Sequence, residues 1–421
     1  MSTAEKVSVP LRTLGERAQS AAAELAQVSG GVRRAALLAM ADALDAGADR
    51  LVAVNREDVE AARGTLTKAL TDRLTLTPSR LADMSKGLRS IAGQPDPVGE
   101  VVEEWTRPNG LRISKVRRPL GVVSVIYEAR PNVTSDVAGL CIMSGNAVML
   151  RGSSAALRTN RCIAEILVEA ATKAGLPEHA IQLVEDTSRE SAVELMQLKG
   201  LVDLLVPRGG PALIRSIEDN ATVPYIIDGD GNCHVYVDRS ADADMATAII
   251  VNAKTSKPSV CNAAETLLVH AGLADRWLPG ALDALEARGV EIRGDETVRR
   301  LWPKALPATE EDWGTEYLDL VLAVRVVPGI EEAIDHVNRW GTSNAEAIVT
   351  ADAKAAEMFT RQVDSGTVFV NASTRFSDGG QFGYGAEIGI STQKLHARGP
   401  LGLRELTCTA YVVWGSGQVR E

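Results

Sequence analysis

The sequence predicts an α/β protein with two lobes, each built around a doubly wound parallel sheet. The chain has 421 residues, which exceeds the roughly 250 to 300 residues at which a single hydrophobic core stops growing. After Pro119, apolar runs of strand type alternate with helical patterns, and a second alternating segment begins near Gly231. Such alternation is typical of parallel sheets with right-handed crossovers. We therefore expect one lobe over residues 1–230 and a second over residues 231–400.

The first lobe should begin with helices. From about Leu11 to Ala92 the apolar residues recur at helical spacing, and the pattern is broken only by Gly64 and by the Thr77-Pro78 step. Glycine and proline at such points end helices or start new ones. An all-helical segment is the expected start of the chain.

A β-hairpin is expected at about residues 100–118. Two extended runs flank Asn109-Gly110 there, and this dipeptide readily supplies the positive φ angles of a tight hairpin turn. The last segment, residues 401–421, contains the strand-like run LTCTAYVVWG. We expect this run to form a strand that pairs with the hairpin.

Composition limits the function. Apolar residues make up 45% of the sequence, charged residues 24%, and the net charge is -10. An acidic chain lacks the positive surface that nucleic acids and anionic membranes require, so neither is expected as a partner. The first residues have no basic segment followed by an apolar one, and no window approaches eighteen consecutive apolar residues. These features predict a cytoplasmic protein.

Two strand-to-helix turns are candidate phosphate sites, although the dinucleotide fingerprint G-x-G-x-x-G is absent. Backbone N–H groups and the positive end of a helix dipole attract anions at such turns. The alternative is that small residues are present because any tight turn needs them. The two turns contain Arg151, Gly152 and Ser153 in MLRGSSAAL, and Gly209 and Gly210 in VPRGGPALI.

Cys261 is the candidate nucleophile. It lies in KTSKPSVCNAAETLLVH, in a loop that leads into a buried strand, and Lys254 and Lys257 are cations that could lower its pKa. The alternative is a small buried packing residue, which is what most cysteines are. The chain has five cysteines, an odd number and with no CxxC pair, so neither a disulfide framework nor a metal site is expected. Four of them look like packing residues: Cys141, Cys162, Cys233 and Cys408.

Nearly the whole chain resembles one family. The segments that carry the resemblance are YEARPNVTSD, LRGSSAA, PNGLRI, KPSVCNAAETLLVH, TEYLDLVLAV, VNASTRFSDGGQFG and STQKLHARGPLGL. They are similar to the gamma-glutamyl phosphate reductase branch of the aldehyde dehydrogenase superfamily, and the CNAAETLLVH and STQKLHARGP segments are highly specific to it. The resemblance implies an aldehyde dehydrogenase-like fold with a cofactor lobe, a catalytic lobe and an oligomerisation hairpin.

The resemblance also implies roles for single residues. Cys261 falls on the nucleophile, and Asn132 falls on the oxyanion-hole asparagine, which would act with the backbone N–H of Cys261. Glu316 falls on the glutamate that binds the nicotinamide ribose; its alternative is a solvated loop carboxylate. The two glycine-containing turns fall on the cofactor site. Arg151, Gly152 and Ser153 would meet the adenosine ribose and any 2′-phosphate, and Gly209 and Gly210 the pyrophosphate.

The implied reaction is the NADPH-dependent reduction of L-glutamate 5-phosphate to L-glutamate 5-semialdehyde and phosphate through a cysteinyl thioester. This is the second step of proline biosynthesis from glutamate. The anionic substrate needs fixed cations, although each candidate could equally be a helix-end or surface charge. The candidates are Lys257, Lys394, His396 and Arg398. A homodimer or homotetramer formed through the hairpin and coupling to a glutamate 5-kinase are the expected partnerships.

The chain differs from the usual pattern of this branch at a few positions. Where aldehyde-oxidising relatives have a glutamate base, this chain has Ile227, with Asp228 beside it, so hydrolysis of a thioester should be weak. Asp230 adds a negative charge, and Asn344 and Ala345 replace a histidine and a hydroxyl residue. These changes leave two rivals open. One is a related acyl-phosphate or aldehyde reductase of a specialised pathway, and the other is a catalytically silent scaffold of the same fold.

Overall fold

The structure is a computed structural model that describes residues 9–227 and 229–420. The chain divides into two compact units. Unit 1 comprises Met1–Ile227, Gly383–Gly389 and Leu401–Glu421, and unit 2 comprises Asp228–Phe382 and Ile390–Pro400. Residues 383–389 therefore group with unit 1, whereas the sequence pattern had placed them in the second lobe. This segment is too short to be recognised from the alternating pattern of strands and helices in the sequence.

Unit 1 begins with a layer of helices. Three of them start at a Ser or Thr (Ser29, Thr67 and Thr77) whose side chain accepts a hydrogen bond from the backbone N–H three residues later. Such caps satisfy N–H groups that have no partner inside the helix. The helices are α1 Leu11–Leu25, α2 Gly30–Ala46, α3 Ala48–Ala61, α4 Lys68–Leu74 and α5 Pro78–Ala92.

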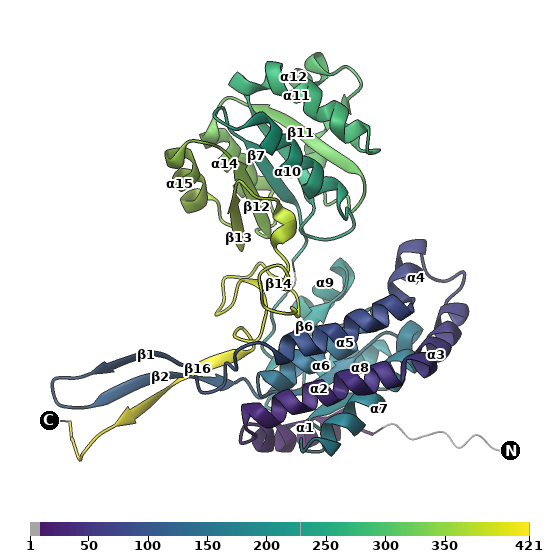
Figure 1. The fold of residues 1–421 in the computed structure, drawn as a ribbon, viewed down its shortest axis with the longest axis vertical. Helices are drawn as coiled ribbons and strands as arrows, with labels where there is room; N and C mark the ends of the chain where they lie inside the picture. Colours follow the sequence, from purple (N-terminus) through teal and green to yellow (C-terminus); the bar gives the residue numbers. More distant parts are fainter. Residues whose placement is uncertain (1–8, 228, 421) are drawn as a thin grey trace. The chain divides into compact units, whose positions relative to one another are not determined.

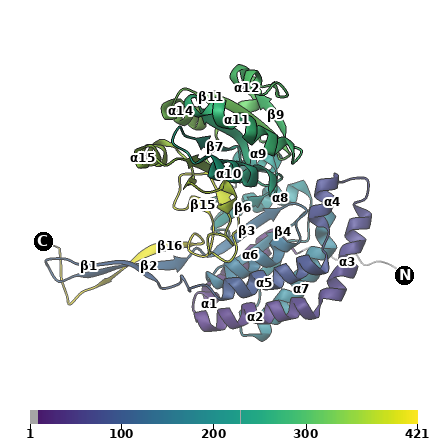
Figure 2. The ribbon, with the colours of Figure 1, turned by 45° about the horizontal axis from the view of Figure 1, so that its top comes forward.

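The core of unit 1 is a four-stranded parallel sheet in the order β5-β4-β3-β6. Every residue of β3 and β4 is buried, as expected where helices cover both faces of a parallel sheet. Figure 2 shows β6, β3 and β4 side by side. The strands are β3 Val122–Tyr127, β4 Ala147–Arg151, β5 Ile181–Leu183 and β6 Leu204–Arg208; the connecting helices are α6 Asn132–Met143, η1 Ser154–Ala156, α7 Leu157–Lys173, α8 Arg189–Met196 and α9 Pro211–Asn220.

The order of these strands creates a topological switch point. The chain adds β4 and then β5 on one side of β3, and returns to place β6 on the other side. The connections that follow β3 and β6 therefore diverge, which leaves a crevice outside the carboxyl ends of these two strands. Ligands of open α/β sheets bind in such crevices.

A three-stranded antiparallel ribbon extends from unit 1 as an arm (Figure 1). It consists of β1 Val101–Thr106, β2 Arg112–Pro119 and β16 Thr407–Trp414, in the order β1-β2-β16. Gly110 in the turn between β1 and β2 has a φ of 87°, the left-handed conformation that glycine adopts without strain. The C-terminal strand β16 pairs with β2 over its whole length.

Unit 2 contains a seven-stranded parallel sheet in the order β10-β9-β11-β8-β7-β12-β13. One hydrophobic cluster packs α10, α11 and α12 on one face, and another packs α14 and α15 on the other face (Figure 1). The strands are β7 Cys233–Val237, β8 Ala264–His270, β9 Glu291–Gly294, β10 Leu306–Pro307, β11 Val321–Val327, β12 Ala345–Val349 and β13 Thr367–Val370. The helices are α10 Ala243–Thr255, α11 Ala271–Glu286, α12 Glu296–Leu301, α13 Glu310–Trp313, α14 Ile330–Trp340 and α15 Ala353–Gln362.

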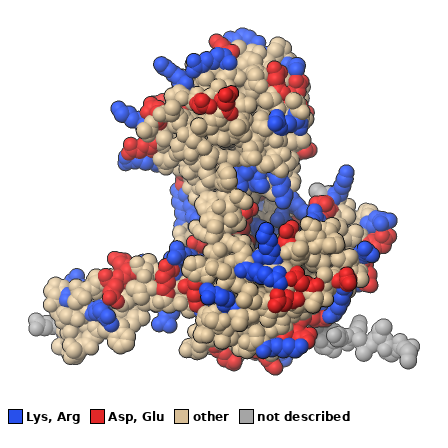
Figure 3. Space-filling model, viewed as in Figure 1, with Lys and Arg blue, Asp and Glu red and all other residues tan. Residues whose placement is uncertain are grey.

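Three short elements complete unit 2. The single turn η2 Thr374–Phe376 follows β13, and β14 Ile390–Ser391 pairs antiparallel with β15 Gly399–Pro400. Acidic and basic side chains are interspersed on the face of unit 2 that Figure 3 shows. Within residues 9–227 and 229–420, none of the helices has the length and apolar character needed to cross a bilayer.

Candidate active site

Cys261 lies in the loop that joins α10 to β8, and its side chain is half-buried. Three other cysteines, Cys141, Cys162 and Cys233, are buried. Burial raises the pKa of the Cys141 and Cys233 thiols, which keeps them protonated and unreactive. Cys408, which the sequence suggested was a packing residue, is exposed on β16, because most residues of this strand of the arm are exposed.

The turn before β7 packs directly against the backbone of Cys261. A Cβ atom on Gly231 would lie 1.6 Å from the carbonyl oxygen of Cys261, so no side chain fits at this position. The Cys233 thiol donates a hydrogen bond to the same carbonyl oxygen at 3.2 Å. These contacts fix the backbone of Cys261, the candidate nucleophile, on the side that faces β7.

Glu316 reaches the same place through Gly231. Its Oε1 accepts a hydrogen bond from the Gly231 N–H at 2.8 Å. Gly231 therefore contacts both Cys261 and Glu316, which lie 55 positions apart in the sequence. Within unit 2, the structure brings together the two residues for which the sequence predicts catalytic and nicotinamide-ribose roles.

Lys254 is not available as an exposed cation beside the thiol, which corrects the sequence-based expectation. Its Nζ lies 2.5 Å from Oε2 of Glu265, and both side chains are fully buried. Burial lowers the pKa of Lys254 and raises the pKa of Glu265 to about 7. The helical pattern of α10 does not reveal which face of the helix Lys254 occupies relative to β8. Lys257, by contrast, is exposed in the loop itself.

The η2 turn holds a further cation over the Cys261 loop. Thr374 Oγ1 donates to the carbonyl oxygen of Asn262 at 2.7 Å, and Asn262 Nδ2 donates to the carbonyl oxygen of Ser377 at 2.8 Å. Between these two anchors lies Arg375, whose Nε donates to Ser256 Oγ at 3.2 Å. Sequence reasoning missed Arg375, although it stands in the VNASTRFSDGGQFG segment that contributed to the family resemblance.

Two of the candidate substrate cations share one acidic partner. Lys394 Nζ lies 2.5 Å from Asp364 Oδ2, and Arg398 Nη1 lies 2.8 Å from Asp364 Oδ1. Hydrogen bonds from Lys394 and then Arg398 lower the pKa of Asp364. The third candidate of this segment, His396, is exposed. The pairing with Asp364 favours the alternative of surface charges for Lys394 and Arg398.

In unit 1, Asn132 is the first residue of α6 and its side chain is exposed. Its Nδ2 donates to Oδ2 of Asp136, one helical turn further on, at 2.9 Å. Burial raises the pKa of Asp136 to about 6, although the hydrogen bond from Asn132 and the charge of Arg208 act in the opposite direction. The Asp136 carboxylate therefore fixes the orientation of the Asn132 amide. Sequence reasoning missed this role of Asp136.

In the turn after β4, the candidate residues Arg151 and Gly152 make contacts that hold the fold together. Arg151 Nη2 donates to the backbone carbonyls of Thr187 at 2.8 Å and Ser188 at 2.6 Å. A Cβ atom on Gly152 would lie 2.1 Å from Asn160 Nδ2, so this glycine is required by the fold. Arg151 Nε, Ser153 Oγ and Asn160 Nδ2 are buried without a hydrogen-bond partner in the part of the chain that the structure describes.

Gly209 and Gly210 lie at the switch point of the unit 1 sheet, between the end of β6 and the start of α9. The Gly210 N–H donates to Glu128 Oε1 at a long 3.3 Å. A Cβ atom on Gly210 would meet nothing within 4 Å, so the space next to this backbone is open. Open backbone at a helix start and a switch point fits the pyrophosphate of a dinucleotide.

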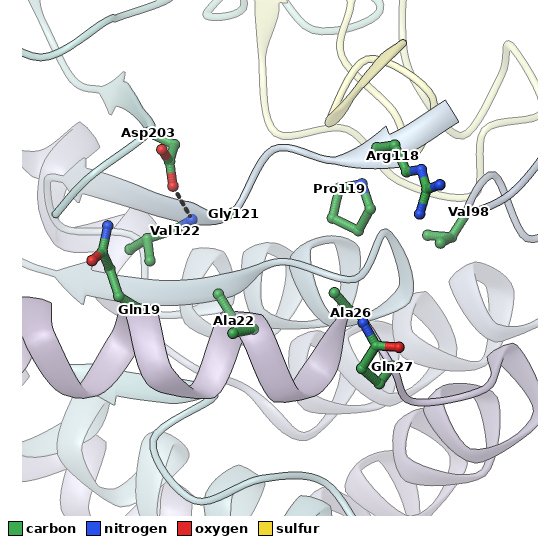
Figure 4. A pocket seen from close by; sticks show the side chains of 11 residues that line it. Gln19, Ala22, Ala26, Gln27, Val98, Arg118, Pro119, Gly121, Val122 and Asp203 are labelled. Carbon is green, nitrogen blue, oxygen red and sulfur yellow. Dashed lines mark hydrogen bonds between the residues drawn. The ribbon is translucent and has the colours of Figure 1, made fainter. Parts of the chain in front are cut away.

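A pocket of about 390 Å³ lies elsewhere in unit 1 (Figure 4). It lies between α1 and the segment that leads into β3, and Asp203 Oδ2 in its wall accepts a hydrogen bond from the Val122 N–H at 2.8 Å. Val122 begins β3 and Asp203 precedes β6. The pocket is therefore at the amino ends of the strands, opposite the edge where dinucleotides bind.

The positions that differ from the family pattern have varied surroundings. Ile227 is buried and Asp230 is exposed, while Asp228 lies outside the described residues. Asn344 is fully buried, and neither atom of its amide has a hydrogen-bond partner among the described residues. Ala345 begins β12. The described residues contain no group of three or more His, Cys, Asp or Glu side chains that could hold a metal ion.

Comparison with known proteins places this arrangement in a family. The model of the aldehyde dehydrogenase family matches residues 8–299 and 313–392. The chain is 54% identical over 416 residues to a gamma-glutamyl phosphate reductase of Moorella thermoacetica, covering 99% of this chain and 100% of the relative. It is 53% identical to one of Thermobifida fusca over 411 residues, covering 97% and 98%.

Solved structures agree with these sequence matches. The crystal structure of gamma-glutamyl phosphate reductase from Thermotoga maritima has a TM-score of 0.95 at 45% identity, covering 98% of this chain and 100% of that chain. An acetylating aldehyde dehydrogenase from Geobacillus thermoglucosidasius, 19% identical, shares the fold with a TM-score of 0.70 and covers 98% and 97%. The predicted fold class is thus confirmed, and the chain belongs to the aldehyde dehydrogenase family and, within it, to the gamma-glutamyl phosphate reductases.

Proposed function

We propose that this protein reduces L-glutamate 5-phosphate to L-glutamate 5-semialdehyde with NADPH and releases phosphate, which is the second step of proline biosynthesis from glutamate. The observation that carries the proposal is the half-buried thiol of Cys261, fixed by Gly231 and Cys233 at the start of β8. Relatives named for this reaction match the chain along almost their whole length, which supports the same substrate.

The chemistry begins at the sulfur of Cys261. Its thiolate attacks the carbonyl carbon of the acyl phosphate, a C–S bond forms, and the C–O bond to phosphate breaks, leaving a thioester on Cys261. The Asn132 amide, oriented by Asp136, is proposed to stabilise the negative oxygen of the tetrahedral intermediate. After reduction of the thioester carbon, the thiohemiacetal on Cys261 collapses, releases the aldehyde and restores the thiolate.

The family implies a nicotinamide cofactor, which supplies the hydride. Gly209 and Gly210 would hold its pyrophosphate, since the space beside the Gly210 backbone is open. Glu316 would hold the nicotinamide ribose with its carboxylate. The turn Arg151–Ser153 would receive the adenosine ribose. The positive charge of Arg151 at the end of β4 is the basis for proposing NADPH instead of NADH.

The thioester is expected to survive long enough to be reduced, because residue 227 is not a general base. Ile227 stands where aldehyde-oxidising relatives have a glutamate, and its apolar side chain cannot take a proton from water. Hydrolysis would waste the activated substrate, so this residue suits a reductase.

Association through the arm is also proposed. Its strands expose apolar side chains that a monomer would leave in water: Val101, Val102, Tyr411, Val413 and Trp414. Much of the arm surface in Figure 3 carries neither acidic nor basic groups. Exposed apolar patches of this kind mark interfaces, so a homodimer or homotetramer is the proposed state.

The reaction can be tested in reverse. Purified protein incubated with glutamate 5-semialdehyde, NADP and phosphate is expected to form NADPH only when phosphate is present. NADPH formation that does not need phosphate would indicate a hydrolytic aldehyde dehydrogenase instead. No turnover together with no alkylation of Cys261 by iodoacetamide at neutral pH would support the silent scaffold.

Asp136→Asn is expected to lower kcat at pH 7 by about tenfold, because a charge-assisted hydrogen bond worth about 1.5 kcal/mol no longer orients Asn132. The wild-type rate should fall as the pH drops through about 6, where Asp136 takes up a proton, and this limb should be absent in the variant. The measurement is kcat against pH.

Asn132→Ala serves as the matched background for this prediction. By itself it should lower kcat by about 10²-fold to 10³-fold, as loss of an oxyanion donor does. Adding Asp136→Asn to Asn132→Ala should cause little further loss if Asp136 acts only by orienting the amide. A full additional tenfold loss in the double variant would contradict the positioning role.

A further inference from the structure

Arg375 is anchored to the loop that carries the nucleophile. Thr374 and Ser377 lie on either side of Arg375, and both are hydrogen-bonded to Asn262, the residue after Cys261. Thr374 donates to the Asn262 carbonyl oxygen, and the Asn262 amide donates to the Ser377 carbonyl oxygen. The Arg375 N–H donates to Ser373 Oγ at 3.3 Å, which caps the η2 turn, and its Nε donates to Ser256 Oγ at the start of the loop. Backbone and side chain are therefore both fixed relative to Cys261.

The charge of Arg375 acts on the thiol, and the structure gives it no ion-pair partner within residues 9–227 and 229–420. Its guanidinium is half-buried and coupled electrostatically to Asp378, Cys261 and Cys233. No carboxylate of the described residues forms a salt bridge with it, and Asp378 Oδ1 instead accepts from the Gly380 and Gln381 N–H groups. Burial is the main cause that lowers the pKa of Arg375, yet arginine stays charged in proteins.

Three other cations of unit 2 are already neutralised by carboxylates, whereas Lys257 is exposed to solvent in the loop and therefore hydrated. Lys254 is paired with Glu265 in the interior, and Lys394 and Arg398 share Asp364. A desolvated cation without a carboxylate is costly unless an anion completes its environment. Arg375 thus has the surroundings of a residue that binds an anionic ligand.

We propose that Arg375 binds the phosphate group of the acyl phosphate substrate and, in the reverse direction, inorganic phosphate. This inference rests on the proposed function. In an acyl phosphate the phosphate is attached to the very carbon that the Cys261 sulfur attacks, whereas the α-carboxylate is at the far end of the glutamyl chain. A cation that interacts electrostatically with that sulfur is therefore better placed to bind the phosphate than to bind the α-carboxylate. The flat fork of guanidinium N–H groups matches two phosphate oxygens at once.

The role in the reaction follows from the charge balance. As the C–S bond forms and the C–O bond breaks, the bonding electron pair leaves with the phosphate, which gains negative charge. Arg375 stabilises this charge and holds the leaving group in line. The leaving phosphate takes up a proton from water to become HPO4²⁻, because trianionic phosphate is a strong base. In the reverse direction the same contact holds phosphate for attack on the thioester, and that proton returns to water.

The test compares wild type, Arg375→Gln and Arg375→Lys in the reverse reaction at saturating semialdehyde and NADP with phosphate varied. Arg375→Gln is expected to raise the KM for phosphate by about tenfold to a hundredfold, and Arg375→Lys by less, because lysine keeps the charge but loses the fork. The KM for semialdehyde should change less than twofold in both variants.

Arg361→Gln is the matched control. Arg361 is an exposed arginine of α15 in the same unit, paired with Glu357, and its loss should leave both KM values unchanged. The thermal unfolding midpoint of each variant shows whether the fold is retained. The alkylation rate with iodoacetamide, which is uncharged, reports on the Cys261 thiolate without involving phosphate.

Three results would overturn the inference. One is an unchanged KM for phosphate in Arg375→Gln. Another is a raised KM for semialdehyde with that for phosphate intact, which would assign Arg375 to the α-carboxylate. The third is an equal fall in the alkylation rate and in kcat with no change in the KM for phosphate. This result would show that Arg375 acts on the Cys261 thiolate and does not bind phosphate. Wild-type protein without any phosphate-dependent turnover would instead refute the proposed function itself, and this assignment with it.

Discussion

Cys261→Ala is expected to lower kcat by about 10⁴-fold or more, because the thioester cannot form without the sulfur. Stability should change little, since the side chain is only half-buried. The measurement is NADPH formation in the reverse direction, together with mass spectrometry after iodoacetamide treatment, which should show one adduct fewer than in wild type.

Cys408→Ala is the matched control for this loss. Cys408 is the other cysteine of this chain with an accessible side chain, on β16 of the arm, and its replacement should retain wild-type kcat. Residual activity of Cys261→Ala within tenfold of wild type would show that the reaction does not proceed through this sulfur. The covalent mechanism would then have to be abandoned.

Gly231→Ala is expected to have the second largest effect. The new methyl group would lie 1.6 Å from the Cys261 carbonyl oxygen and 2.3 Å from its carbonyl carbon, so one backbone segment must move. We expect a loss of about 1 to 3 kcal/mol in the free energy of unfolding, as overpacking produces. A fall in kcat of about 10²-fold or more should accompany it, because even a displacement of about 1 Å misplaces the nucleophile.

Gly280→Ala tests whether the effect of Gly231→Ala comes from this contact. A Cβ on Gly280, which lies inside α11, would meet nothing within 4 Å, and alanine favours helices over glycine by about 1 kcal/mol. Its unfolding midpoint should therefore rise slightly and its kcat should not change. Wild-type kcat and alkylation rate in Gly231→Ala would contradict the proposed clamp on Cys261.

Local sequence was sufficient to predict the fold class and the local conformation at single motifs. The alternation of strand and helix patterns predicted the parallel sheets, since side-chain periods of 2.0 and 3.6 are set by residues only a few positions apart. Asn109-Gly110 predicted the hairpin turn, and Gly110 has the positive φ angle that such a turn needs. The loop before β8 likewise followed from its Pro and Ser residues. The catalytic roles of Cys261, Asn132 and Glu316 stay predictions until they are tested.

The partners of the charged residues could not be predicted in the same way. Lys254 is a plausible activating cation by its place in the sequence, but α10 packs on β8 so that its Nζ meets Glu265. Lys394 and Arg398 pair with Asp364, thirty or more positions earlier in the chain. Arg375 received no role from sequence, because its neighbour Cys261 lies more than a hundred residues away.

The sequence by itself thus determined which segments are strands, helices and turns, and which cysteine stands in a loop. The tertiary structure decided which residues meet: Gly231 with Cys261 and Glu316, Asp136 with Asn132, and the η2 turn of Arg375 with the Cys261 loop. The physical reason is that periodicity and turn chemistry act within one element. Contacts between elements depend on the order of strands in the sheet and on the burial of each face, and no short window of sequence contains this information.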